Sequence, residues 1–445
     1  MEIPTELLAK IFIHCLPSES ESDDSMAHSS FRLQDAPLLL TKVCREWRSV
    51  ALHEPRLWCT LHVRIPRAVN TKNLEFWESR MEGIRKWLDR SGQVPLSLAF
   101  SGGPNMYPVP TTAAAPYHSF VLQLEILFAS QSHRWKSLEL EGYFLIEPFF
   151  VNPREHASIL DSVKIEFTPF FHIPAIQEHL LKYCLGISSL RRLHLRGYEL
   201  FDTSWVRFPW SNLTEIVLQP IIRGEGPLLT LATALDILSQ ASNLRLCVMD
   251  LTAVEDAIIR NRERAPIILP FLRILDIYLA INLQGVSYAS EDDAKHVFSP
   301  LITPRLETLT MRSRVRQIPP FSLHIPFLCF FSQPGPPPIT TLKMEIHINL
   351  RSCIECLRLV PNLQSLSLNH LIVKPTPDST NPGDNSPGCS SEDLFRSLIP
   401  SPDNPTPLCP RLESLELIQY DDLSDPTVLF ALAKARNDIS GLSTH

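Results

Sequence analysis

The stretch that decides the fold is LRRLHL, residues 190–195. Its first, fourth and sixth residues are apolar and the others are polar, which is the period of a strand with one buried face. The pattern recurs as WKSLEL at 135, LDSVKI at 160, LTEIVL at 213, LRILDI at 272, LETLTM at 306, ITTLKM at 339, LQSLSL at 363 and LESLEL at 412. LRLCVM at 244 is a weaker copy, and VPLSLAF at 94–100 is a candidate first strand. The sequence therefore predicts a series of similar strands.

Amphipathic segments lie between several of these strands, among them residues 173–184, 228–241 and 351–362. Their apolar residues have the spacing of a helix face. Strands that alternate with helices predict an α/β fold built on a parallel sheet. One strand–helix unit cannot bury its apolar face alone, so we expect such units to fold only as a stack.

The pattern and its spacing resemble the leucine-rich repeat class. Neighbouring copies start 23 to 34 residues apart, except that the last follows after 49, whereas such repeats have about 20–29 residues. The variable length and the mostly missing asparagine or cysteine turn depart from that class. We predict that residues 63–445 form an irregular leucine-rich-repeat-like solenoid, a curved parallel sheet with helices outside, with a disordered insertion at about 374–393. The alternative is another kind of α/β domain that reuses this strand pattern.

The first sixty residues predict a separate helical region. A first helix is expected between Pro4, which suits the first helical position, and Pro17, which ends it. An acidic segment at 18–34 is too polar to build a core and predicts a mobile loop. A second helix is expected from Asp35, a capping residue, to Pro55. These helices carry more apolar residues than so small a core needs, so some are left for a partner.

The two segments IPTELLAKIFIHCLP (3–17) and APLLLTKVCREWRSVALHEPRLW (36–58) resemble an F-box, with an L/I-P-x-E-[IL]-L-x-x-I-F helix followed by a V-C-[KR]-x-W-[RK] helix. The chain departs from that pattern in Ile3, which replaces a common leucine, and in the long insertion between the helices. The resemblance implies a three-helix F-box at residues 1–62 that docks on the Skp-type adaptor of a cullin–RING ubiquitin ligase. It implies an adaptor-facing set of Pro4, Leu7, Leu8, Ile11, Phe12, Leu39, Leu40, Val43, Cys44, Trp47 and Trp58. The alternative is that these residues form the private core of a helical cap.

The sequence contains no motif that predicts catalysis. It has no phosphate-binding loop, dinucleotide-binding glycine pattern, nucleophile elbow or zinc-protease helix. The one C-x-x-C, at Cys353 and Cys356, has no second pair for a zinc site and falls in a helical pattern, which favours buried packing. We therefore predict that the chain is not an enzyme and has no catalytic residue, metal or cofactor.

The composition of the chain bears on its cellular location and on the classes of partner that it can bind. The formal net charge is 41 − 48 = −7, which gives no global attraction to nucleic acid or to an anionic membrane. The most apolar stretch, residues 265–283, contains two prolines, Arg273 and Asp276, so it does not predict a membrane span. The ten cysteines show no regular spacing, and the N-terminus has no basic leader region. We expect a soluble protein that is cytoplasmic, nuclear or both.

The polar positions of the repeated strands are candidates for binding a substrate protein. They include Glu139, Glu141, His194, Arg196, Tyr278 and Arg312. Their mixed charges favour a protein or peptide over a phosphate backbone. Together with the F-box resemblance, this predicts the substrate-receptor subunit of a ubiquitin ligase, with an unknown target protein. The alternative is a repeat-based interaction scaffold outside ubiquitin transfer.

Overall fold

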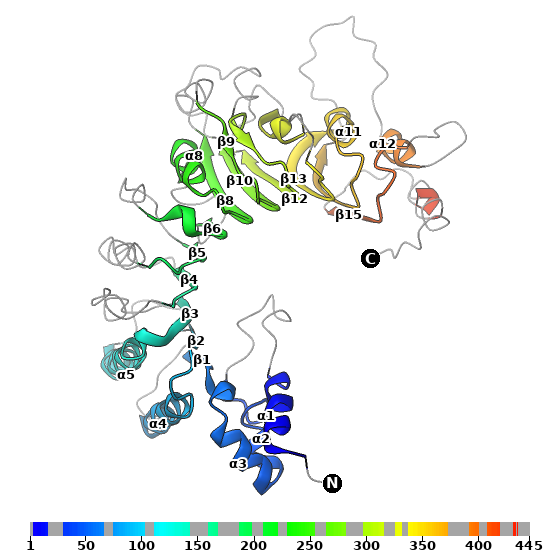
Figure 1. Ribbon diagram of the computed structural model, residues 1–445. Coiled ribbons are helices and arrows are strands. Elements are labelled where there is room, and N and C mark those ends of the chain that lie inside the picture. Colours follow the sequence, from blue (N-terminus) through cyan, green and yellow to red (C-terminus); the bar gives the residue numbers. More distant parts are fainter. Residues whose placement is uncertain are drawn as a thin grey trace, which may run out of the picture. The chain divides into compact units, whose positions relative to one another are not determined.

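The computed structural model describes residues 3–16, 30–65, 74–102, 111–142, 159–167, 187–197, 208–220, 229–253, 264–281, 297–315, 325–331, 337–372, 391–399, 407–418, 430–432 and 434. The chain divides into two compact units. The first unit holds residues 1–198 and 202–212, and the second holds 199–201 and 213–445. Figure 1 labels many of the helices and strands of both units.

The first unit begins with short helices and continues as a parallel sheet. Its elements are α1 (Thr5–His14), α2 (Leu40–Val43), α3 (Arg45–His53), η2 (Pro55–Trp58), β1 (Thr60–Ile65), α4 (Leu74–Arg90), β2 (Leu96–Gly102), α5 (Thr111–Ala129), η4 (Ser132–Arg134), β3 (Trp135–Gly142), β4 (Ser162–Phe167), β5 (Arg192–Arg196) and η6 (Trp210–Asn212). Strands β1 to β5 pair in parallel and in chain order. In Figure 1, α4 and α5 lie on the same side of these strands.

The second unit contains a longer parallel sheet. Its elements are β6 (Glu215–Gln219), β7 (Leu229–Thr230), α8 (Leu231–Gln240), β8 (Leu246–Ala253), β9 (Ile267–Ile268), β10 (Ile274–Ile281), β11 (Leu301–Ile302), β12 (Thr308–Val315), η7 (Ile325–Phe330), β13 (Thr341–Asn349), α11 (Leu350–Arg358), β14 (Ser365–Ile372), α12 (Ser391–Leu398) and β15 (Ser414–Ile418). The strands pair in parallel in the order β6-β8-β10-β12-β13-β14-β15. β7 pairs with β8, and β9 with β11 forms a separate two-stranded sheet.

The strand register follows the repeated pattern, so the α/β class and the parallel sheets are confirmed. The fourth residue of each copy pairs with the fourth residue of the next, as Leu138, Val163 and Leu193 do in the first unit. The same holds through the second unit for Ile216, Cys247, Leu275, Leu309, Leu342, Leu366 and Leu415. In nearly every copy the first, fourth and sixth residues are buried. The last copy is less buried at Leu415 and Leu417, on β15, which is the last strand in the order of the described residues.

Strand β1 was not predicted. β1 has the same pattern, WCTLHV at 58–63, with Trp58, Leu61 and Val63 buried. It pairs with β2, so the predicted boundary between residues 62 and 63 falls inside a strand of the sheet. The helical segment and the repeats are therefore joined without an intervening linker at this point.

Several helices agree with the sequence and others were missed. α8 and α11 confirm the helices predicted within 228–241 and 351–362, whereas the segment 173–184 lies outside the described residues. α4, α5 and α12 were not predicted. α12 begins at Ser391, so the last residues of the predicted disordered insertion, 374–393, belong to a helix; the rest of that insertion lies outside the described residues. Leu394 and Leu398 are one turn apart and buried, which explains the helix.

The single second helix predicted from Asp35 to Pro55 is wrong, because the chain breaks at Cys44. α2 ends at Val43, and Cys44 has an extended backbone (φ −154°, ψ 174°). Its Sγ accepts a hydrogen bond of 3.4 Å from the Trp47 amide, so Cys44 caps α3. The helical region therefore contains α1, α2 and α3, followed by the single turn η2.

The described end of the predicted loop 18–34 packs against β1 and α4. The Ser30 amide donates to the His62 carbonyl oxygen (3.1 Å), and the His62 amide donates to Ser30 Oγ (2.7 Å). The Phe31 ring lies 5.5 Å from that of Trp87 on α4. Residues 18–29 lie outside the described residues.

The most apolar stretch of the sequence consists of strands. Between residues 265 and 281 the chain forms β9, a turn and β10. None of the helices in the described ranges has the length and apolar character that a bilayer crossing requires.

Candidate functional site

The N-terminal helices have a small core of their own. Leu8 and Phe12 on α1 and Leu40 on α2 are buried. The Phe12 ring lies 4.9 Å from the half-buried Trp47 ring of α3, which fixes α1 against α3. Three of the residues predicted to face an adaptor, Leu8, Phe12 and Leu40, therefore contribute to this core.

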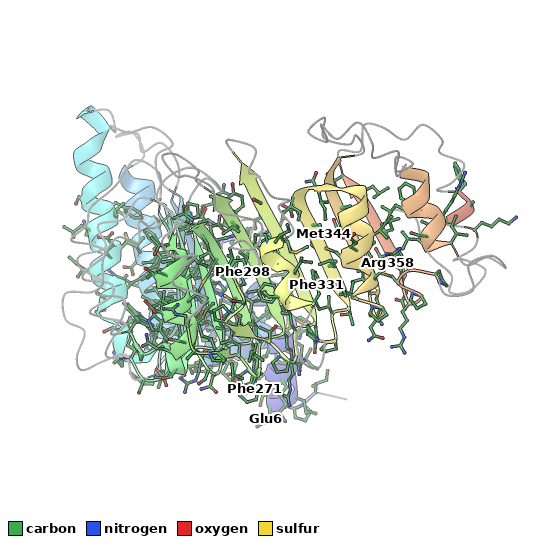
Figure 2. All side chains as sticks on the ribbon, turned by 90° about the horizontal axis from the view of Figure 1, so that it is seen from above. Glu6, Phe271, Phe298, Phe331, Met344 and Arg358 are labelled. Carbon is green, nitrogen blue, oxygen red and sulfur yellow. The ribbon has the colours of Figure 1, made fainter. Side chains whose placement is uncertain are left out.

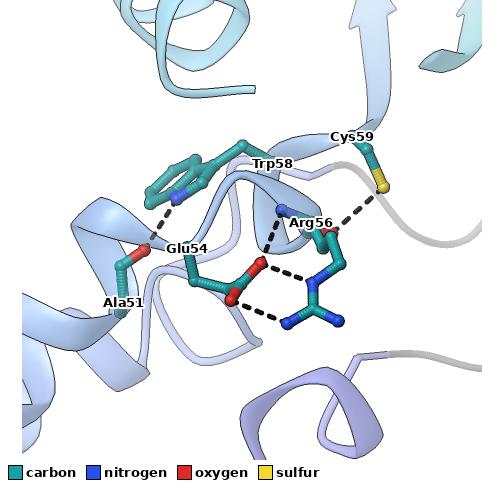
Figure 3. Close-up of polar contacts among 5 residues, drawn as sticks. All are labelled: Ala51, Glu54, Arg56, Trp58 and Cys59. Atoms are coloured by element: carbon teal, nitrogen blue, oxygen red, sulfur yellow. Dashed lines mark hydrogen bonds and ion pairs between the residues drawn. The ribbon is translucent and has the colours of Figure 1, made fainter. Parts of the chain in front are cut away.

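Trp58 is also buried, so its predicted place on the adaptor surface is not supported by its position. Its indole Nε1 donates a hydrogen bond of 2.8 Å to the Ala51 carbonyl oxygen (Figure 3). Its ring meets the Trp87 ring edge-on at 4.8 Å, and the Arg90 guanidinium lies 4.6 Å from its centre. Trp58 therefore packs between α3 and α4.

The turn η2 is held by an ion pair beside Trp58. Arg56 donates from Nε to Glu54 Oε1 (2.6 Å) and from Nη2 to Oε2 (2.9 Å), and its amide also donates to Oε1 (3.2 Å), as Figure 3 shows. These bonds, above all the one from the Arg56 side chain, lower the pKa of Glu54 from its ordinary value. Cys59 Sγ donates to the Arg56 carbonyl oxygen (3.0 Å).

Large apolar side chains remain exposed on the same helices. On the α1 side, Ile3, Leu7 and Ile11 recur every four residues and are 52%, 51% and 48% exposed. On the α2 side, Leu39 and Val43 are also four apart and exposed. We call these five residues the exposed apolar stripe. Pro4 and Cys44, two further residues predicted to face the adaptor, are exposed next to Ile3 and Val43 in the chain.

The four predicted substrate residues of the first unit lie on β3 and β5, the two strands that flank β4. In the strand register Glu139 is opposite Lys164, which is opposite His194, and Glu166 is opposite Arg196. Lys164 forms an ion pair with Glu139. Arg196 Nη1 lies 3.3 Å from Glu166 Oε2. The face therefore carries alternating charges, most of them already paired within the sheet.

Glu141 is a further carboxylate of the same strands. It lies opposite Ser101 of β2 and Glu166 of β4. Burial raises its pKa first, and the nearby Glu166 and Glu139 raise it further. Lys164 and Arg64 act in the opposite direction. The charged form of Glu141 is thus disfavoured by its surroundings.

The two predicted substrate residues of the second unit lie on β10 and β12. Arg312 on β12 forms an ion pair with Asp276 on β10, and its Nε lies 2.9 Å from Glu345 Oε2 on β13. Tyr278, opposite Arg312 in the register, is buried. Asp250, opposite Tyr278, is buried as well, and its Oδ1 is 3.5 Å from the Gln219 amide nitrogen.

The structure therefore separates the predicted substrate residues into one group in each unit. Asp250 and Glu345 were missed, although each is the seventh residue of a repeat, the place that Tyr278 and Arg312 occupy in theirs. Applying the repeat position to every copy would have found them.

The cysteine pair has no reactive character. Cys353 and Cys356 on α11 are buried, and burial raises the pKa of both thiols, that of Cys356 to about 12. Both thiols are therefore protonated at neutral pH, which disfavours nucleophilic or metal-binding roles. Within the described ranges no group of three or more His, Cys, Asp and Glu residues is placed to hold a metal ion.

Comparison of the chain with known protein-family models finds no match, and comparison with curated proteins finds no similar sequence. The local motifs and the side-chain geometry therefore carry the functional proposal.

Proposed function

We propose that the protein is a substrate-receptor subunit of a cullin–RING ubiquitin ligase. In this proposal α1 to η2 are an F-box that docks on a Skp-type adaptor. The repeats form an irregular leucine-rich-repeat solenoid that binds the target protein. The observation that carries the proposal is the exposed apolar stripe, which lies on helices whose core is already filled by other side chains.

The stripe has little to contribute to the stability of the free chain. Leu8 and Phe12 make the core contacts of α1, while Leu7 and Ile11 on the adjacent part of the helix face solvent. Burying an exposed leucine or isoleucine against a partner is favourable by about 1.5–3 kcal/mol. Soluble proteins rarely expose contiguous apolar surface without such a use.

The contacts of Trp58 support a mechanism by proximity. They join α3 to α4. The N-terminal helices are therefore packed directly against the helix that follows β1. A receptor of this kind needs no catalytic residue, because it acts by raising the local concentration of a bound target near the transfer machinery.

Co-expression with a Skp-type adaptor tests the proposal. Leu7→Asp with Ile11→Asp should abolish co-purification, because both side chains are exposed and the charges would be buried in the interface. Ile126→Asp on α5 is the matched control, since Ile126 is equally exposed but lies outside the helical region. It should leave the complex intact.

Two results would overturn the proposal. One is a folded wild-type chain that does not bind the adaptor, which would favour the interaction scaffold outside ubiquitin transfer. The other is unchanged binding by the Leu7→Asp, Ile11→Asp variant. Leu8→Asp and Phe12→Asp are unsuitable here, because both side chains are buried and their loss would unfold the helices.

A further inference from the structure

Three large apolar side chains are exposed where the chain passes from β9 into β10. Ile268, Phe271 and Ile274 are 58%, 42% and 39% exposed. They alternate with buried residues of the same stretch, namely Ile267, Leu269, Leu272 and Leu275. Figure 2 shows Phe271 at the rim of the second unit, in contrast to the buried Phe298.

The backbone of this stretch is fixed by the neighbouring repeats. The Leu269 amide donates to the Ile302 carbonyl oxygen (2.9 Å) on one side. The Ile274 amide donates to the Arg245 carbonyl oxygen (3.1 Å) on the other. The exposed side chains are therefore presented on an ordered edge, and their own repeat fills its core without them.

Three exposed arginines lie in this stretch or on the repeats beside it. The Arg305 guanidinium lies 5.7 Å from the centre of the Phe271 ring. Arg245 and Arg273 are neighbours, because the Arg245 carbonyl oxygen also accepts a hydrogen bond from the Arg273 amide (2.9 Å). Of the three, Arg273 lies near a carboxylate of the next repeat, Glu307, with an N–O distance of 3.7 Å.

The surroundings leave this edge basic. In the described part of the chain, Glu307 is the one carboxylate that forms an ion pair with these arginines. Glu215, on β6, lies opposite Leu246, the residue after Arg245. The whole chain has a net charge of −7, so a group of three arginines is a local reversal of sign. Single exposed apolar residues are ordinary, but an aromatic side chain framed by arginines has the composition of a binding hot spot.

We propose that Ile268, Phe271, Ile274, Arg245, Arg273 and Arg305 form a docking edge for an acidic amphipathic segment of a partner protein. The apolar side chains would contact leucine or phenylalanine of that segment. The guanidinium groups would bind its aspartate and glutamate carboxylates with paired hydrogen bonds. The inference extends the target-binding half of the proposed function and does not depend on adaptor docking.

The test measures binding of a synthetic peptide to the purified full chain by fluorescence anisotropy. The labelled peptide alternates leucine and phenylalanine with glutamate and aspartate, and a second peptide carries lysine in place of the acidic residues. Phe271→Ala and the pair Arg245→Glu, Arg273→Glu should each weaken binding of the acidic peptide roughly tenfold or more. Leu359→Ala and Arg358→Glu, which alter exposed residues at the end of α11, are the matched controls and should bind normally.

The proposal is overturned if the acidic peptide does not bind, if the lysine peptide binds equally well, or if the edge variants bind like the controls. Binding to phosphatidylserine vesicles without binding to the peptide would also overturn it, in favour of a membrane surface. Adaptor co-purification of the same variants separates this outcome from failure of the proposed function. It should be unaffected, because these residues lie in the second unit.

Discussion

The indole nitrogen of Trp58 donates a hydrogen bond to the carbonyl oxygen of Ala51, and both residues are completely buried. This bond closes the end of α3 onto η2, directly before β1 begins. Because the same ring contacts Trp87 and Arg90 of α4, one side chain joins the N-terminal helices to the first strand–helix unit. The resemblance to an F-box placed Trp58 on a partner surface, but its contacts assign it to the core.

Replacement of Trp58 should therefore affect stability more than adaptor binding. Trp58→Ala should lower the free energy of unfolding by about 3–5 kcal/mol. Trp58→Phe keeps a ring but leaves the Ala51 carbonyl oxygen without its donor, and should cost about 1–3 kcal/mol. Urea unfolding measures both. A Trp58→Phe chain that is as stable as wild type but does not bind the adaptor would return Trp58 to the interface.

Replacement of two neighbouring residues of α1 should change the stability of the chain by very different amounts. Leu8 is 3% exposed, so Leu8→Ala should destabilise the chain by about 2–5 kcal/mol. Leu7 is 51% exposed, so Leu7→Ala should change the free energy of unfolding by less than about 0.5 kcal/mol. Thermal unfolding of the two variants side by side makes the comparison. Equal losses would mean that the exposed apolar stripe belongs to the core.

Arg134 closes the end of α4 from within the core. It is buried, and its Nη2 donates to the Leu88 carbonyl oxygen (3.1 Å) and to Ser91 Oγ (2.9 Å). Its Nη1 donates to the carbonyl oxygens of Gly92 and Val94. Burial lowers the pKa of the guanidinium, and the main-chain oxygens compensate for this desolvation.

Removal of these donors should be costly. Arg134→Met fills a similar volume but leaves several buried oxygens unpaired, so the free energy of unfolding should fall by about 3 kcal/mol or more. Arg134→Lys keeps the charge but cannot reproduce the planar set of donors. Its free energy of unfolding should lie between those of wild type and Arg134→Met. Urea unfolding at neutral pH gives both values. Wild-type stability of Arg134→Met would contradict the capping role.

Arg312, one of the predicted substrate residues, is also expected to stabilise the parallel strands of the second unit. Arg312→Gln breaks the ion pairs to Asp276 and Glu345, which are partly shielded from solvent, and should cost about 1–3 kcal/mol. A double-mutant cycle with Asp276→Asn should give a coupling energy of about 0.5 kcal/mol or more. Strictly additive losses would show that the pair contributes nothing to the fold.

The strands were predictable from the sequence because the same positions of each short repeat are buried. An apolar residue at the fourth and sixth positions points into the same layer in every repeat, whatever lies between the repeats. The pattern therefore gives the register, Leu138 opposite Val163, before any contact is known. The helix α4 was harder to predict, because it is not part of the repeated strand pattern. Its buried side is formed by Met81, Ile84 and Leu88.

The site could be predicted only in part. Leu7, Leu8, Ile11 and Phe12 occupy a wide arc of α1, and their sequence does not say which half of that arc meets α3. The contact between Phe12 and Trp47 decides it, and this contact depends on the break at Cys44, which a capping search for Ser, Thr, Asp or Asn does not detect. Tertiary packing therefore separates core from surface.

Two carboxylates of the first unit should show opposite responses to pH. The pKa of Glu54 is lowered by Arg56, so this carboxylate stabilises the fold above its unfolded pKa and loses that effect as the pH falls through its folded pKa. The pKa of Glu141 is raised by burial and by Glu166 and Glu139. Its ionisation therefore opposes folding at neutral pH, and that cost disappears as the pH falls through its folded pKa.

Thermal unfolding of two glutamine variants across pH checks these signs. At pH 7 Glu54→Gln should melt below wild type, whereas Glu141→Gln should melt above it, because glutamine removes a favourable charge in the first case and an unfavourable one in the second. Both differences should shrink on acidification. The Glu141 difference should shrink at a higher pH than the Glu54 difference, since the pKa of Glu141 lies above its ordinary value and that of Glu54 below. A Glu141→Gln chain that melts below wild type at neutral pH would mean that this carboxylate is stabilised by its neighbours Lys164 and Arg64 more than it is destabilised by burial.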